Sequence, residues 1–252
     1  MQNPSMPEKT ARVARFFVDA PLAVGDELIL PDEAAHHAVH VLRLRAGGDI
    51  MLFNGRGGEF AGRIAAAERR RVRVALLEYR GIERESPLAV TLVQGVSAGE
   101  KMDFTVQKAT ELGVAALQPV IAARSLGRLA GERAAARRAH WQRVVIAACE
   151  QCGRNRVPAV HPVVPLAEHC RQDARARSRL LLSPLAARGL RAARIEAPVT
   201  LAAGPEAGFT ADEEAMLIAA GYEPVRLGPR VLRTETAALA ALAALNALAG
   251  DF

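Results

Sequence analysis

The sequence lacks long apolar runs, and it also lacks the features of an exported protein. None of its 252 residues belongs to a stretch of the roughly 18 to 20 apolar residues that a membrane-spanning helix requires. The N-terminal residues show no apolar segment followed by a small-residue cleavage site, as a signal peptide would. We therefore expect a cytoplasmic protein without a membrane segment.

Cysteine is scarce as well, with three residues in the chain, and their positions argue against a metal or redox centre. Cys149 and Cys152 have C-x-x-C spacing, but a thioredoxin-like motif begins a helix, whereas this pair stands at a predicted helix end. A zinc site needs further ligands, for which His161 or His169 are the candidates beside Cys170. We expect no metal.

Charge is present in ordinary amount but is unevenly distributed. Half of the residues are apolar and 24% are charged, a globular balance that excludes wholesale disorder. Residues 124–194 contain 15 cations and four anions, whereas residues 195–252 contain three cations and eight anions. The basic segment favours RNA or DNA as partner, because arginine and lysine displace counterions from phosphates. A solvated, arginine-rich helix surface is the alternative that composition leaves open.

Residues 12–80 are predicted to form strands around one short helix. The helix begins at Asp32 and carries His36, His37 and His40, for which packed or surface positions are favoured over metal ligation. A hairpin is predicted at 50–64, because Asn54-Gly55 and Gly57-Gly58 favour turns between alternating segments. Several short strands with glycine-rich turns suggest a small barrel, followed by a charged linker at 81–87.

From residue 88 onward, predicted strands alternate with predicted helices. This alternation indicates an α/β domain with a mostly parallel sheet and helices on both faces. Ligands of such sheets bind beyond the carboxyl ends of the strands. The final helix, 236–249, is apolar all round, so it is buried either in the domain core or in a homodimer interface, which we favour.

Three loops of this second part contain more polar residues than a plain connection needs. In the first, 203–210, Glu206 stands among glycine and proline, and Thr210 with Glu213 has capping-box spacing. The second, 227–236, contains two arginines before the last helix, with Thr234 as the predicted N-cap. The third, 150–156, follows a long helix in the basic segment. On their spacing alone, these loops could also be ordinary connections between strands and helices. Neither the dinucleotide-binding motif nor the P-loop motif is present.

Taken together, these motifs resemble the ribosomal small-subunit methyltransferase E family of the SPOUT superfamily. The resemblance rests, in chain order, on HHAVHVLRLRAGG at 36–48, DFTVQKATELGV at 103–114, ARSLGR at 123–128, EQCGRNRVPAV at 150–160, AGPEAGFTADE at 203–213 and LGPRVLRTETA at 227–237. It covers nearly the whole chain. One departure is Ala207, where the family usually has glycine, a change that matters only if the position requires a positive φ.

The resemblance implies a particular fold, partner and reaction. The expected fold is a PUA-like β-barrel domain at 1–86, which binds RNA, followed by an α/β SPOUT domain at 87–252 with a C-terminal trefoil knot. Family members are homodimers that use S-adenosylmethionine to methylate N3 of a uridine near the decoding centre of 16S ribosomal RNA in the small ribosomal subunit. The alternatives are a catalytically silent RNA-binding protein with the same fold, and a related methyltransferase that acts on transfer RNA or on another base.

The resemblance also implies the residues of the cofactor pocket. They belong to three segments of the second domain: Leu181, Leu182 and Ser183; Gly204, Pro205 and Glu206; and Leu227, Gly228, Val231, Leu232, Arg233 and Thr234.

The chemistry of the reaction suggests candidate catalytic residues, and basic residues are the candidates for contacts to RNA. Uracil N3 must lose its proton before it attacks a methyl group, so the site needs a proton acceptor or a cation beside the developing anion. Glu206 or Glu150 is the candidate base, and Arg233, Arg124 or Arg154 is the candidate cation, without a ranking among them. The basic residues expected to contact RNA are Arg43, Arg45, Lys101, Arg128, Arg154 and Arg156.

Overall fold

The computed structural model describes residues 13–68, 71–125, 129–172 and 176–252. The chain divides into two compact units, Met1–Glu83 and Arg84–Phe252. This division falls inside the charged segment predicted as the linker.

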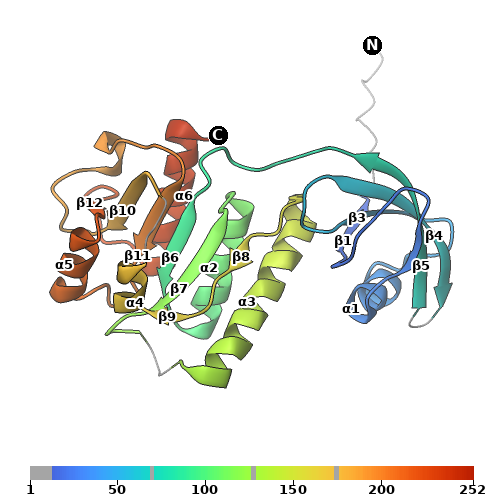
Figure 1. The fold of residues 1–252 in the computed structure, drawn as a ribbon, viewed down its shortest axis with the longest axis horizontal. Helices are drawn as coiled ribbons and strands as arrows, with labels where there is room; N and C mark the ends of the chain where they lie inside the picture. The colour runs from blue at the N-terminus through green and yellow to red at the C-terminus, as the bar shows by residue number, and fades with distance from the viewer. Residues whose placement is uncertain (1–12, 69–70, 126–128, 173–175) are drawn as a thin grey trace, which may run out of the picture. The chain divides into compact units, whose positions relative to one another are not determined.

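The first unit is built on a five-stranded sheet (Figure 1). In the strand order β1-β3-β4-β5-β2, β1 and β3 run parallel and all other neighbours run antiparallel. β3 and β4 form the predicted hairpin, and Gly55, Gly57 and Gly58 have positive φ in its turn. Among the described strands β1 and β2 are not paired, so the predicted barrel is open there. The strands are β1 (Ala14–Phe17), β2 (Glu27–Ile29), β3 (Asp49–Phe53), β4 (Glu59–Glu68) and β5 (Arg71–Arg80).

The short helix predicted from Asp32 packs on this sheet. It consists of α1 (Asp32–His36) and a π-helical turn, η1 (His37–Val41), so it ends earlier than the glycines at 47 and 48 that the sequence suggested. Ala35 and Ala38 are buried in the core of the unit, and Ala34 packs against it. The rings of His36 and His40 lie 4.6 Å apart on the exposed side, so these histidines take surface positions, as predicted.

The second unit contains a sheet in which every pairing is parallel, as predicted. The strand order is β12-β10-β11-β6-β7-β8, and β9 also pairs with β7. Parallel strands place all their carboxyl ends at one edge of the sheet. The strands are β6 (Thr91–Gly95), β7 (Ala116–Ile121), β8 (Ala159–Val160), β9 (Val164–Pro165), β10 (Ser178–Leu182), β11 (Val199–Ala203) and β12 (Glu223–Val225).

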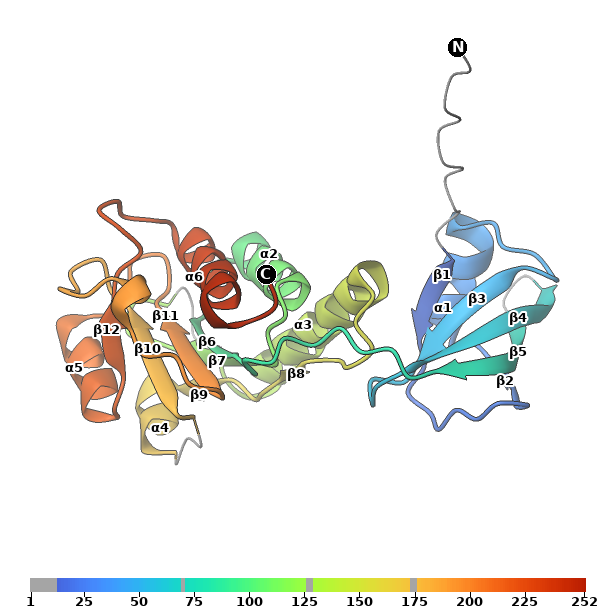
Figure 2. The same cartoon turned by 90° about the horizontal axis from the view of Figure 1, so that it is seen from above.

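Helices cover both faces of this sheet (Figure 2). α2, α3 and α6 pack together on one face, and α4 and α5 lie on the other. The second face is sealed by an apolar cluster that includes Val93, Leu181 and Leu217. The helices are α2 (Gly99–Glu111), α3 (Gly131–Cys152), α4 (Leu166–Arg171), α5 (Ala211–Ala219) and α6 (Thr234–Ala249), with a 3₁₀ turn, η2 (Leu190–Ala192). No helix in the described part of the chain is long and apolar enough to cross a membrane.

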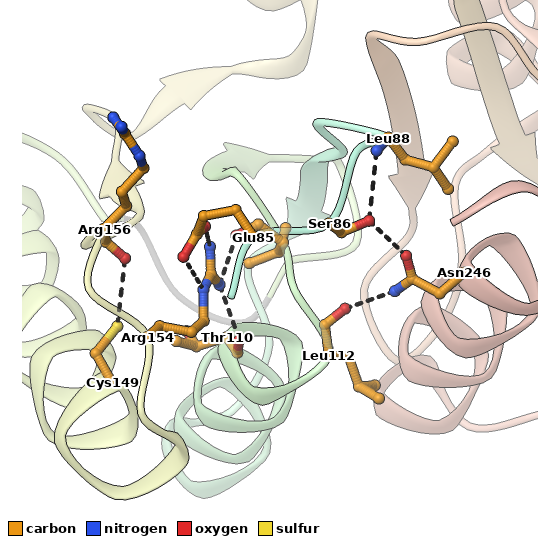
Figure 3. Close-up of polar contacts among 10 residues, drawn as sticks. Glu85, Ser86, Leu88, Thr110, Leu112, Cys149, Arg154, Arg156 and Asn246 are labelled. Carbon is orange, nitrogen blue, oxygen red and sulfur yellow. Dashed lines mark hydrogen bonds and ion pairs between the residues drawn. The ribbon is translucent and has the colours of Figure 1, made fainter. Parts of the chain in front are cut away.

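Arg154 lies inside the second unit, where it joins three segments (Figure 3). Its side chain is 4% exposed and forms an ion pair with Glu85. Its Nη1 atom donates to the carbonyl oxygen of Thr110, in the last turn of α2, at 2.8 Å, and to that of Val114, just beyond α2, at 2.9 Å. This geometry does not fit the catalytic or RNA-contacting role predicted for Arg154, because the guanidinium is enclosed and already satisfied by protein groups.

A second buried polar group ties the same segments to α6 (Figure 3). The Oγ atom of Ser86 donates to Oδ1 of Asn246 at 2.7 Å, and Nδ2 of Asn246 donates to the carbonyl oxygen of Leu112 at 2.8 Å. Asn246 is 2% exposed. The first residues of the second unit are therefore fixed to α2 and α6 by side-chain hydrogen bonds.

We expect Arg154→Ala to destabilise the protein strongly. The substitution removes the ion pair with Glu85 and the hydrogen bonds to the carbonyl oxygens of Thr110 and Val114, and loss of one partner from a buried ion pair costs about 3 kcal/mol. Urea unfolding followed by circular dichroism measures the change. Arg171→Ala, at an exposed site, is the control. Equal unfolding free energies for the two variants would show that the Arg154 contacts contribute nothing.

Candidate functional site

A cavity of about 430 Å³ lies at the carboxyl edge of β10, β11 and β12. It is lined by the segments that follow these three neighbouring strands, because each strand ends at this edge. Cavities of this volume hold small organic ligands. Ten of the twelve residues predicted for the cofactor pocket line it: Leu182, Ser183, Gly204, Pro205, Glu206, Leu227, Gly228, Val231, Leu232 and Thr234.

The other two residues predicted for the pocket lie elsewhere. Leu181 is fully buried in the core beneath the sheet, because its side chain alternates with those of its neighbours along β10. Arg233 is exposed and is the N-cap residue of α6. Thr234, the predicted N-cap, is instead the first helical residue.

The side chain of Thr234 joins the loops that form the cavity. Its hydroxyl donates to the carbonyl oxygen of Gly204 at 2.5 Å and accepts a hydrogen bond from Nε2 of Gln94 at 3.0 Å. Gln94 belongs to β6, Gly204 follows β11, and Thr234 begins α6. Gln94 and Thr234 are both buried, so these hydrogen bonds hold the three segments together without competition from water.

Backbone approaches in this region leave no space for side chains. A Cβ atom on Gly95 would lie 2.5 Å from Cδ of Pro205, and one on Gly204 would lie 2.8 Å from the backbone nitrogen of Phe209. The loop at 204–209 therefore folds tightly on itself and against the end of β6. Its positive φ occurs at Gly208, not at Ala207, so the departure at Ala207 introduces no backbone strain.

Glu206 is held as an anion at the border of the cavity. Its Oε1 atom accepts a hydrogen bond of 2.8 Å from the backbone nitrogen of Ala98, and Nζ of Lys101 lies 3.7 Å away. Burial opposes ionisation, but the backbone hydrogen bonds and Lys101 outweigh it and lower the pKa of this carboxyl. A carboxylate with a lowered pKa accepts protons weakly, so a binding role is favoured over that of general base.

The second oxygen of Glu206 indicates that the cavity receives a ligand. Oε2 is buried and has no hydrogen-bond partner among the described residues. Buried carboxylate oxygens are normally satisfied. A ligand that donates hydrogen bonds from hydroxyl or amino groups, and that has an apolar or aromatic part for Leu182 and Leu232, fits this lining.

Charged residues outside the set predicted for the pocket also line the cavity. Glu214 accepts a hydrogen bond of 3.2 Å from the hydroxyl of Ser183, and Arg226 and Arg230 lie on the segment after β12. Glu214 follows the capping box of Thr210 and Glu213, which is present as predicted. In the sequence it is indistinguishable from an acidic residue that stabilises a helix N-terminus.

Arg124 is placed beside the cavity by two hydrogen bonds. Its Nη1 atom donates to the carbonyl oxygens of Ala207, at 2.8 Å, and Phe209, at 3.4 Å. The neighbouring backbone nitrogen, that of Ala123, donates to Glu213 at 2.6 Å. These contacts bring the loop after β7 against the loop that contains Glu206, so the exposed Arg124 stands next to the site.

The remaining predicted residues lie away from the cavity or outside the described chain. Glu150 is half-buried in the last turn of α3, and Arg156 is exposed just beyond that helix. Arg43 and Arg45 are exposed in the first unit, and Arg43 has a positive φ of 55°. Arg128 lies outside the described residues.

The cysteines and histidines form no metal site in the part of the chain that the structure describes. Cys149 is buried, and Cys152 is the last residue of α3, which confirms that the C-x-x-C pair stands at a helix end.

Comparisons with known proteins assign both units to RNA methyltransferases. A family model described as an RNA methyltransferase domain matches residues 84–246, and one described as an RNA methyltransferase PUA domain matches residues 30–77. The ribosomal RNA small subunit methyltransferase E of Synechocystis sp. is 32% identical, with 97% of this chain and 82% of that protein covered. The Buchnera aphidicola (Schizaphis graminum) protein of the same name is 30% identical, with 95% and 98% covered.

Two solved structures extend this likeness to the fold. One is ribosomal RNA small subunit methyltransferase E from Neisseria gonorrhoeae bound to S-adenosyl methionine, with 44% identity, a TM-score of 0.91 and coverage of 95% of this chain and 99% of that chain. The other is a methyltransferase of Legionella pneumophila described as putative, in complex with the same cofactor, with 38% identity, a TM-score of 0.92 and coverage of 96% and 100%.

We expect Gly95→Ala to destabilise the second unit. The added methyl group would overlap Pro205, and overpacking of this kind costs about 1 to 3 kcal/mol. Denaturant unfolding measures the loss. Gly189→Ala is the matched control, because a Cβ atom there would meet its nearest neighbour only at 3.9 Å. If both variants unfold at the same denaturant concentration, the close approach of residue 95 to the loop is not a constraint.

Proposed function

This chain belongs to the ribosomal RNA small subunit methyltransferase E family, and we propose that it transfers a methyl group from S-adenosylmethionine to small-subunit ribosomal RNA. The observation that carries the proposal is the cavity at the edge of β10, β11 and β12, which is formed by the motif segments and contains a buried, unpartnered oxygen of Glu206. Its fold is the α/β SPOUT fold of that family, preceded by a PUA-like domain.

The residues that line the cavity fit S-adenosylmethionine. Leu182, Val231 and Leu232 offer apolar contact to an adenine ring, and the backbone at Gly204 and Gly228 can approach a ligand closely. The unpartnered Oε2 atom of Glu206 accepts a hydrogen bond from a hydroxyl or amino group of the ligand. The bound cofactor supplies an electrophilic methyl group, so this chemistry needs no metal.

We place the transferred methyl group on N3 of a uridine near the decoding centre, in line with the resemblance of the motifs. Loss of the N3 proton leaves an anion that is delocalised over the uracil oxygens, and a cation beside those oxygens lowers the barrier. Arg124 and Arg233 are the arginines for this role, because both are exposed beside the loops of the cavity. The lowered pKa of Glu206 leaves it the weaker candidate for the base.

The first unit supplies contacts to the RNA in this proposal. Its match to the PUA model covers residues 30–77, and Arg43 and Arg45 are exposed within that range. RNA-modifying enzymes need contacts to the phosphate backbone outside the reaction centre to position their target. We propose that Arg43 and Arg45 provide such contacts in the cytoplasm, where ribosomal subunits are assembled.

We further propose that the protein is a homodimer whose C-terminal segment forms a trefoil knot. Within α6, Leu242 and Leu245 are fully buried in the unit itself, so they belong to the core. Leu248 and Phe252 remain 47% and 66% exposed at the end of the chain. A second copy would cover these apolar side chains, as expected for an isologous interface.

Methyl transfer to defined RNAs tests the proposed function. The protein is incubated with labelled S-adenosylmethionine and, separately, with hypomethylated small ribosomal subunits, naked small-subunit RNA and transfer RNA. We expect label in small-subunit RNA, and nucleoside mass spectrometry should identify N3-methyluridine. Label confined to transfer RNA, or a different methylated base, would refute the proposed substrate, and failure to bind the cofactor would refute the enzyme altogether.

We expect Arg233→Ala to reduce turnover while the protein remains dimeric. Removal of a group that stabilises transition-state charge lowers kcat by about 100-fold or more. Steady-state kinetics measure the rate, and light scattering measures the mass. Arg191→Ala, an exposed site that does not line the cavity, serves as control. A wild-type kcat in the Arg233→Ala variant would show that Arg233 takes no part in the reaction.

A further inference from the structure

A second cavity, of about 600 Å³, lies in the second unit between the turn after β6 and the amino-terminal half of α3. The turn contributes Ser97 and Ala98, and the helix contributes Arg133, Arg137 and His140. No residue predicted for cofactor binding lines this cavity. It is therefore distinct from the pocket at the edge of β10, β11 and β12.

The two cavities are adjacent. Ala98 lines the second cavity, and its backbone nitrogen donates the 2.8 Å hydrogen bond to Glu206, which lines the first. This hydrogen bond therefore connects the linings of the two cavities. Because β6 neighbours β11 in the sheet, both cavities open at the same carboxyl edge, where α/β sheets bind their ligands.

Positive charge in the second cavity is not neutralised by the protein. Arg133 and Arg137 are separated by one helical turn, so they lie on the same face of α3. Both side chains are exposed, and no hydrogen bond or ion pair joins either of them to a described residue. Two like charges at this spacing repel each other, so an anion between them is favourable.

The position of Arg137 increases this imbalance. Its Nη1 atom lies 4.0 Å from the site that a Cβ atom on Gly99 would occupy, at the amino end of α2. That end carries partial positive charge, which repels a guanidinium. Asp103 contacts Nε2 of His140 at 2.8 Å through Oδ2, while its Oδ1 atom is buried, and Glu206 contacts Ala98 and Lys101. Neither carboxylate forms an ion pair with Arg133 or Arg137.

We propose that this cavity binds a backbone phosphate of the RNA substrate next to the target nucleotide, through Arg133 and Arg137. Guanidinium groups match phosphate oxygens in charge and in planar, two-pronged geometry. A phosphate fixed here holds the strand while the target base reaches the neighbouring cavity, so these arginines position the substrate and do not react with it. The inference rests on the proposed function, since it assigns to RNA a site beside the methyl donor.

The test uses the variant Arg133→Gln/Arg137→Gln and the control Arg143→Gln, an exposed arginine on the same helix that does not line the cavity. We expect the double variant to bind small-subunit RNA roughly tenfold more weakly, as expected for loss of charge-assisted hydrogen bonds. The slope of log K against log salt should also shrink, by about 0.7 for each phosphate that the protein no longer neutralises. Each single variant should show part of the effect.

Three readouts separate the possible outcomes. S-adenosylmethionine affinity should be unchanged in the double variant, and its KM for RNA should rise more than its kcat falls. RNA affinity and salt slope equal to those of Arg143→Gln would overturn the proposal and leave the arginines as a solvated helix face. Loss of cofactor affinity in the double variant would also overturn it. If the wild-type protein binds RNA through these arginines but transfers no methyl group, the proposed function is refuted, whereas the phosphate site is supported.

Discussion

The hydrogen bonds of Thr234 are the constraint on which the site depends. This one hydroxyl joins β6, the loop after β11 and the start of α6, and β6 is more than a hundred residues away from the other two segments along the chain. Loops at the edge of a sheet are otherwise the mobile parts of a domain. Because the hydroxyl of Thr234 both donates and accepts a hydrogen bond inside the protein, it fixes the backbone around Gly204. The cavity beside this backbone is therefore preorganised for a ligand.

Steric and electrostatic contacts reinforce that constraint. The absence of a side chain at Gly95 lets Pro205 lie directly against β6, and Glu206 then reaches the backbone of Ala98. The same carboxylate is kept ionised by Lys101 and by backbone hydrogen bonds. The hydrogen bond between Ala98 and Glu206 therefore joins the linings of the two cavities. The first cavity offers an unpartnered oxygen and apolar side chains, and the second offers guanidinium groups without a carboxylate partner among the described residues. The first cavity thus suits a cationic methyl donor, and the second suits an anionic RNA strand.

Much of the second unit could be predicted from the sequence because its strands and helices alternate with clear periodicity. The predicted helix end at Cys152 and the capping box at Thr210 are both present. β12 was not predicted, since it has only three residues and contains Pro224, and proline is disfavoured in strands. That strand nevertheless brings the segment with Leu227 and Gly228 to the cavity.

The errors at individual residues have a common physical origin. Arg154 stands in a basic segment, so the sequence suggests an exposed RNA contact, but the fold encloses it with Glu85. Conversely, Arg133 and Arg137 lie in the same basic segment with nothing to distinguish them, and only the packing of α3 beside the turn after β6 gives them a cavity. Burial depends on tertiary contacts, so charge counts along the chain locate an RNA-facing region without identifying its residues.

The most direct test of the cofactor site is calorimetric titration of S-adenosylmethionine into wild-type protein and into the Thr234→Val variant. Wild-type protein should bind one cofactor per chain. The variant, which lacks the hydroxyl that is hydrogen-bonded to both Gly204 and Gln94, should bind about tenfold more weakly. Equal affinities, or no binding to the wild-type protein, would contradict the assignment of this cavity as the cofactor site.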